Sequence, residues 1–234
     1  MQVGELKSIN GETSPLVDAH DKEGQHAARE GGLIHRVMRA LELTRGVEIA
    51  RRYLAMNAFD GALTMLGLVL GGLLTINPSN PEPGFAAILL AAFGTSIAMA
   101  VSGFSGSYLA ESAERDREVE NLGRAMLTDM SDSMYARAGR TTSVVVAIVD
   151  GASPAVAAFL IIIPLLFVPA GYLDYNVALY LSVGICMVIL FLLGLFLGAV
   201  SKKNIWSYGA KTLFAGIITA ALMYVVSWVT GAGG

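Results

Sequence analysis

Cysteine, histidine and charged residues are scarce in the apolar parts of this chain, and each shortage excludes a class of site. The single cysteine, Cys186, excludes a disulfide framework or a cysteine metal cluster within one chain. The histidines all precede the apolar blocks, at His20, His26 and His35. No HExxH, P-loop or nucleophile-elbow pattern occurs. We therefore expect a protein that is not an enzyme and that does not bind nucleic acid or a permanent cofactor.

The two ends of the chain lack long apolar runs. The N-terminal region is polar and has no apolar h-region, so no cleavable signal peptide is expected. Residues 1–32 are rich in Gly and charged residues, and we expect a disordered tail there. Residues 231–234 form a short C-terminal tail.

What the chain has instead is hydrophobicity in long blocks. Hydrophobic residues make up 54% of the 234 residues, and the mean hydropathy is +0.59. A helix needs roughly 20 apolar residues to cross a bilayer. Five blocks of the domain 53–230 reach that length, at 53–76, 84–109, 143–168, 177–200 and 208–230. The chain is therefore predicted to be an all-α, multi-pass integral membrane protein with five transmembrane helices.

Basic residues predict its orientation. All 16 Lys and Arg lie before the first block, between the second and third, or around the link between the fourth and fifth. The connections 77–83 and 169–176 contain none. By the positive-inside rule the N-terminus is cytoplasmic and the C-terminus lies outside or in a lumen. The membrane is the cell membrane in a prokaryote and a vacuolar-type membrane in a eukaryote.

Two segments on the predicted cytoplasmic side are helical in pattern. Between 33 and 52, apolar residues recur at helical spacing among arginines, which predicts an amphipathic helix. It can lie on the membrane or pack on the protein's own cytoplasmic loop, and the sequence does not separate these alternatives. The second segment, 111–140, is long and polar.

Asp60 is the strongest functional signal. A carboxylate at membrane depth costs on the order of 2.5–3.5 kcal/mol on insertion scales, so it marks a site for ions or a structural contact. Asn57 lies one turn earlier on the same helix, and Met65 follows about one turn later. Oxygen and thioether ligands together suit a borderline divalent cation. The alternative is a structural aspartate that is protonated or bonded to serines of a neighbouring helix.

Asp150 is a second carboxylate within an apolar block. Pro154, four residues later, has no N–H, so the main-chain carbonyl of Asp150 loses its helical partner. A carboxylate and a free carbonyl at one residue can bind a cation. The alternative is a simple proline kink.

The second block and its continuation supply further candidates. Ser102 and Ser105, with Met65, are expected along a substrate path, although the small residues there equally favour tight helix packing. If the helix continues, Glu111, Glu114 and Glu118 share one face and can gather cations. The alternative is a solvated face with i,i+4 ion pairs such as Glu111–Arg115.

Several segments, taken in order, resemble the vacuolar iron transporter family. Asn57-x-x-Asp60-Gly61 is similar to its first span, and residues 108–119 are similar to its extended second helix. Residues 158–165 and 209–224 are similar to its third and fifth spans. The similarity extends over about residues 50–230, as expected of a divergent, prokaryotic-type member with a short cytoplasmic segment.

The resemblance implies proton-coupled export of Fe²⁺ or Mn²⁺ from the cytosol by a homodimer. Asp60 matches the family's intramembrane aspartate, and Glu118 matches the start of its cytoplasmic metal-binding region. Gly103 stands where the family has a methionine, Ser107 where it has a glutamate, and Asp150 is an additional acid.

We therefore predict a transporter that exports Fe²⁺ or Mn²⁺ in exchange for protons, with metal ions, protons, lipid and a second copy as its partners. On this hypothesis Asp60 and Asp150 bind metal and proton alternately. A non-transporting oligomeric scaffold and a metal-dependent lipid-modifying enzyme are the alternatives.

Overall fold

The computed structural model describes residues 32, 34–77 and 79–231, and five long helices dominate them. In chain order these are α2 (Gly46–Thr75), α3 (Glu82–Met126), α4 (Met134–Leu166), α5 (Tyr175–Val200) and α6 (Ile205–Thr230). All five are long and apolar enough to cross a membrane, and the described residues include no strand. The predicted all-α, multi-pass membrane protein with five spans is confirmed. Apart from Gly32 and Gly231, the predicted tails lie outside the described residues.

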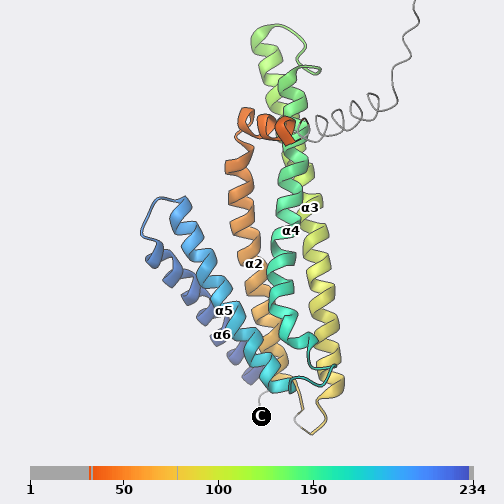
Figure 1. The fold of residues 1–234 in the computed structure, drawn as a ribbon, viewed down its shortest axis with the longest axis vertical. Coiled ribbons are helices and arrows are strands. Elements are labelled where there is room, and N and C mark those ends of the chain that lie inside the picture. Colours follow the sequence, from red (N-terminus) through yellow and green to blue (C-terminus); the bar gives the residue numbers. More distant parts are fainter. Residues whose placement is uncertain (1–31, 33, 78, 232–234) are drawn as a thin grey trace, which may run out of the picture.

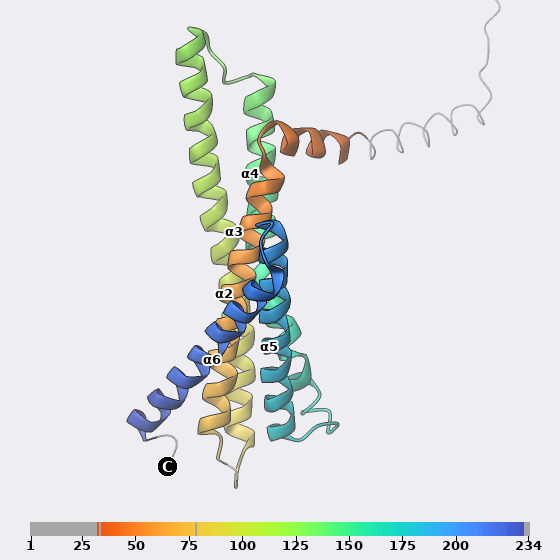
Figure 2. The same ribbon diagram turned by 90° about the vertical axis from the view of Figure 1, so that its left-hand side faces the viewer.

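Helices α2, α3 and α4 run side by side along the long axis of the molecule, and α5 and α6 form a hairpin that leans against them (Figure 1). The two views together show that α6 diverges from the other helices toward the C-terminal end (Figure 2). Successive helices alternate in direction. The described basic residues that precede α2, end α3, begin α4 and join α5 to α6 therefore gather at one end of the bundle. That this end is cytoplasmic stays a prediction.

The predicted cytoplasmic segment 111–140 is a helical hairpin that extends the bundle. Helix α3 continues as far as Met126, well past the apolar block expected to end near residue 109. It ends at Leu127, which adopts a left-handed conformation with φ 54°. Helix α4 then begins after Ser133, whose hydroxyl accepts a hydrogen bond of 3.1 Å from the N–H of Ala136. This N-cap fixes the start of the returning helix.

The predicted amphipathic helix 33–52 is broken in two. Residues 34–43 are helical, Thr44 and Arg45 turn the chain, with Arg45 at φ 53°, and α2 starts at Gly46. The short helix lies across the end of α2 (Figure 2). At its C-terminal end Ala40 and Leu41 are buried against the protein itself. Ile34, two turns before Leu41 on the same face, is 67% exposed.

The hydrophobic core lies where α2, α4 and α5 meet. Its fully buried side chains include Met65, Leu66, Ile161, Leu179 and Leu190. Gly194 and Gly198 of α5 pack on α6, where an added Cβ would lie 2.7 and 2.6 Å from the Cα atoms of Gly209 and Ile205. This part of the fold is a tightly packed helix seam.

A second close crossing joins α2 and α3 to α4 at mid-bundle. A Cβ on Gly61 of α2 would lie 2.7 Å from the Cα of Pro154, and one on Gly103 of α3 would lie 3.0 Å from the Cα of Gly151. Backbone atoms cannot move aside as a flexible side chain can. The small residues therefore set how closely these three helices approach.

Replacement of Gly61 by alanine should separate α2 from α4. Overpacking against the backbone of Pro154 is expected to cost about 1–3 kcal/mol, seen as a lower melting temperature of the purified protein in detergent. Gly67→Ala on the same helix is the matched control, because its added Cβ meets no atom within 4 Å. That control should be neutral or slightly stabilising, since alanine favours a helix more than glycine does. Equal melting temperatures for the two variants would contradict the close contact.

Candidate functional site

The two aspartates singled out by the sequence lie at the middle of their helices. Asp60 is 14 residues from the first residue of α2 and 15 from the last. Asp150 is 16 residues from each end of α4. Their surroundings differ, because Asp60 is exposed on the single chain whereas Asp150 is only 4% exposed.

Asp60 lines a cavity of about 440 Å³ between α2 and α3. The wall is formed by three helices, with Asn57, Asp60 and Gly61 from α2, Thr95, Ala98, Met99, Ser102 and Gly103 from α3, and Pro154 from α4. Within the part of the chain that the structure describes, the Asp60 carboxylate has no hydrogen bond or ion-pair partner. An unpaired carboxylate at this depth is costly, so the cavity is the place where a cation would be stabilised.

The cavity offers a mixed set of donor atoms. Asp60 supplies a carboxylate, Asn57 an amide, and Met99 a thioether, while Thr95 and Ser102 add hydroxyls. Among the residues that the structure describes, no lysine or arginine lines it. Hard oxygen and soft sulfur donors on one wall suit a borderline divalent transition metal rather than an anion.

Asp150 is held in a polar contact beside this cavity rather than in its wall. One carboxylate oxygen accepts a hydrogen bond from Nδ2 of Asn57 on α2, and the other accepts one from the hydroxyl of Ser107 on α3. The two aspartates therefore do not converge on one cation. They are linked through Asn57, which contacts Asp150 and also lines the cavity.

Two residues expected on the substrate path lie elsewhere. Met65 is fully buried in the hydrophobic core, because the five residues that separate it from Asp60 carry it about 140° around the helix. Ser105 is exposed and lies beyond Gly103, the last residue of α3 in the cavity wall. Ser102 lines the cavity, and its place on a substrate path stays a prediction.

Sequence reasoning missed Met99 and Ser107. Met99 brings a thioether to the cavity. It lies one turn before Gly103, the position at which the family that the sequence resembles has a methionine. Its i,i+3 spacing from Ser102 was the available signal. Ser107 binds Asp150, a contact between helices that no spacing within α3 could have revealed.

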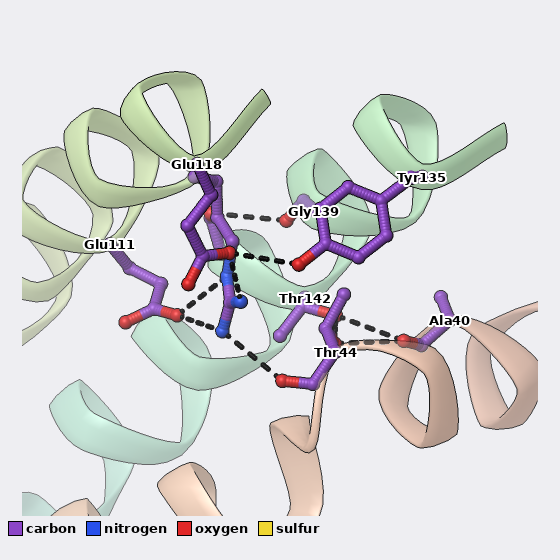
Figure 3. Close-up of polar contacts among 9 residues, drawn as sticks. Ala40, Thr44, Glu111, Glu118, Tyr135, Gly139 and Thr142 are labelled. Atoms are coloured by element: carbon purple, nitrogen blue, oxygen red, sulfur yellow. Dashed lines mark hydrogen bonds and ion pairs between the residues drawn. The ribbon is translucent and has the colours of Figure 1, made fainter. Parts of the chain in front are cut away.

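The acidic face beyond the apolar part of α3 is organised around Arg115. Figure 3 shows its carboxylates Glu111 and Glu118 converging toward the guanidinium, with Tyr135 of α4 beside them. Arg115 binds Glu111 at 2.6 Å and Glu118 at 2.8 Å, and its Nη2 also donates to the carbonyl of Thr44 at 3.4 Å. Two of the three predicted cation-gathering glutamates are therefore ion-paired, and Glu114 alone is exposed. No group of three or more acidic, histidine or cysteine side chains in the described residues is arranged to hold a metal ion.

Burial and charge both act on this cluster, which we name the Arg115 cluster (Glu111, Arg115, Glu118 and Tyr135). Burial by itself disfavours the guanidinium cation, but Glu111 and Glu118 outweigh it, so the pKa of Arg115 is raised. Burial and the hydrogen bond to Glu118 also raise the pKa of the Tyr135 hydroxyl. The cluster is a charge-paired contact that joins the turn at Thr44 to α3 and α4.

Comparison with known proteins finds a family match and a similar archaeal protein. The VIT family model matches residues 119–228, from the polar extension of α3 to the end of α6. An uncharacterized protein of the archaeon Methanocaldococcus jannaschii is 28% identical over 197 residues, which cover 82% of this chain and 96% of that protein. The chain is thus an integral membrane protein that is similar to the VIT family over residues 119–228.

Proposed function

We propose that this protein exports Fe²⁺ or Mn²⁺ from the cytoplasm in exchange for protons. The observation that carries the proposal is the unpartnered carboxylate of Asp60 at mid-helix, in a cavity that also presents an amide, a thioether and hydroxyls. A divalent cation would satisfy that carboxylate, and so would a proton. Competition between the two at one site is what exchange requires.

The substrate path needs a second copy of the chain. Asp60 is exposed on the single chain at a depth where lipid would otherwise face it. Exposure of a carboxylate to hydrocarbon costs several kcal/mol, whereas a partner packed over the cavity would enclose it as a protein-lined passage. The proposed transporter is therefore a homodimer with its two cavities near the interface. Glu114, exposed on the polar extension of α3, is the candidate first contact for an arriving cation.

The test is metal flux through the purified full chain reconstituted in liposomes. Mn²⁺ entry is followed by quenching of a trapped fluorescent chelator, and Fe²⁺ is tested in the same way without oxygen. With an acidic lumen, entry should be faster than after a protonophore has abolished the pH gradient. Entry no faster than in protein-free liposomes would refute transport, and entry insensitive to the gradient would refute proton exchange.

A further inference from the structure

The orientation of the Asn57 amide is set by its hydrogen bonds. Among the described residues, both of them are donated by Nδ2, one to the main-chain carbonyl of Tyr53 at 3.2 Å and one to a carboxylate oxygen of Asp150. A main-chain carbonyl can only accept, and so can an ionised carboxylate. The opposite flip would place Oδ1 against these two oxygens, so the amide nitrogen must face them and Oδ1 is left for other partners.

Asp150 is itself fixed from both sides. Its second carboxylate oxygen accepts the hydroxyl of Ser107, so both oxygens are engaged by neighbouring helices. The close approach of Gly103 to Gly151 holds α3 and α4 at the separation that this contact needs. Both Asp150 oxygens are thus directed at neighbouring helices, and Asp150 is absent from the cavity wall.

Asn57 connects the hydrogen-bonded Asp150 to the cavity. It lies three residues before Asp60 on α2, and both line the same wall. A hydrogen bond donated by Nδ2 to a side-chain oxygen also polarises the amide and increases the negative charge on Oδ1. A carboxylate and a polarised amide oxygen on adjacent turns form a paired ligand for a divalent cation.

We propose that Asp150 is a positioning residue, which with Ser107 turns the Asn57 amide so that its Oδ1 binds a divalent cation held by Asp60. This inference rests on the cation site proposed above and assigns Asp150 a role different from direct metal and proton binding. Such outer partners of a metal ligand orient it and raise its basicity.

The experiment is a titration of the full chain in detergent with Mn²⁺ alone, in which electron paramagnetic resonance measures free Mn²⁺. Asp150→Ala should weaken binding about 10-fold or more, the usual loss when an outer partner of a ligand is removed. Asp150→Asn should stay within about twofold of wild type, because its Oδ1 can accept from Asn57 while its Nδ2 donates to Ser107. In an Asn57→Ala background, Asp150→Ala should add no further loss.

Each other outcome has a definite meaning. A loss in Asp150→Asn as large as in Asp150→Ala would show that the charge itself is needed, and would overturn the positioning role. Additive losses in the double variant would overturn it too, because a purely structural aspartate acts independently of Asn57. Wild-type affinity in Asp60→Asn would remove the cation site and this inference together. Loss in Asp60→Asn with full affinity in Asp150→Ala would overturn this inference alone. Gel filtration of every variant shows whether it is folded.

Discussion

Substitution of Asp60 by asparagine should reduce Mn²⁺ flux through the reconstituted protein to the level of protein-free liposomes. Asparagine keeps the size of the side chain and an oxygen ligand but removes the one charge that the described residues bring to the cavity wall. The remaining amide, thioether and hydroxyl donors are neutral, and they cannot offset the loss of hydration that a divalent cation suffers at mid-helix. The protein itself should remain folded, because the Asp60 carboxylate makes no hydrogen bond or ion pair within the described residues.

The matched control makes the same chemical change where no cavity exists. Asp132 lies in the turn between α3 and α4 and is exposed, so Asp132→Asn should transport Mn²⁺ at the wild-type rate. The initial rate of fluorescence quenching, normalised to the amount of reconstituted protein, measures both variants. Undiminished flux in Asp60→Asn would refute the proposed site even if the wild-type protein transports Mn²⁺.

The five spans could be predicted because an apolar block of about 20 residues is long enough to cross a bilayer as a helix. The helix ends could not be predicted, because ion pairs and tertiary contacts set them rather than hydrophobicity. Helix α3 runs on to Met126 through polar sequence that is stabilised by pairs such as Glu111–Arg115. The turn at Thr44 and Arg45 before α2 could not be predicted either, because the helical spacing of apolar residues continues through it. Gly46 instead fits under Leu41 and Thr142, contacts that only the tertiary structure supplies.

The candidate site was predictable where its residues share one helix face. Asn57 and Asp60 are three residues apart, and the structure places both in one wall. Met65 does not line this wall, because a residue five positions after Asp60 does not lie on the same helix face. The distinction between Asp60 and Asp150 depends on what each side chain meets across a helix boundary, and a single sequence does not encode that directly. Depth alone made the two aspartates look equivalent.

Removal of the Arg115 guanidinium should cause the largest loss of stability outside the core. Its side chain is 6% exposed and that of Glu111 9%, so Arg115→Met would leave a buried, unpaired carboxylate. Such a loss costs about 3–5 kcal/mol, because the remaining charge keeps its desolvation penalty without its partner. The contact from Arg115 to the carbonyl of Thr44 would also be lost, which frees the turn that leads into α2. Thermal unfolding of the purified protein in detergent measures the change.

The chain contains a matched control for this prediction. Arg124 pairs with Glu120 on the same helix with the same i,i+4 spacing, but the two side chains are 73% and 62% exposed. Arg124→Met should therefore cost about 0.2–1 kcal/mol, the usual value of an exposed pair. Addition of Glu111→Gln to Arg115→Met should recover much of the loss, because the unpaired charge is then gone. Equal destabilisation by Arg115→Met and Arg124→Met would contradict a buried ion pair. A double variant no more stable than Arg115→Met would mean that packing of the arginine stem against Gly139, rather than charge, holds this end of the bundle together.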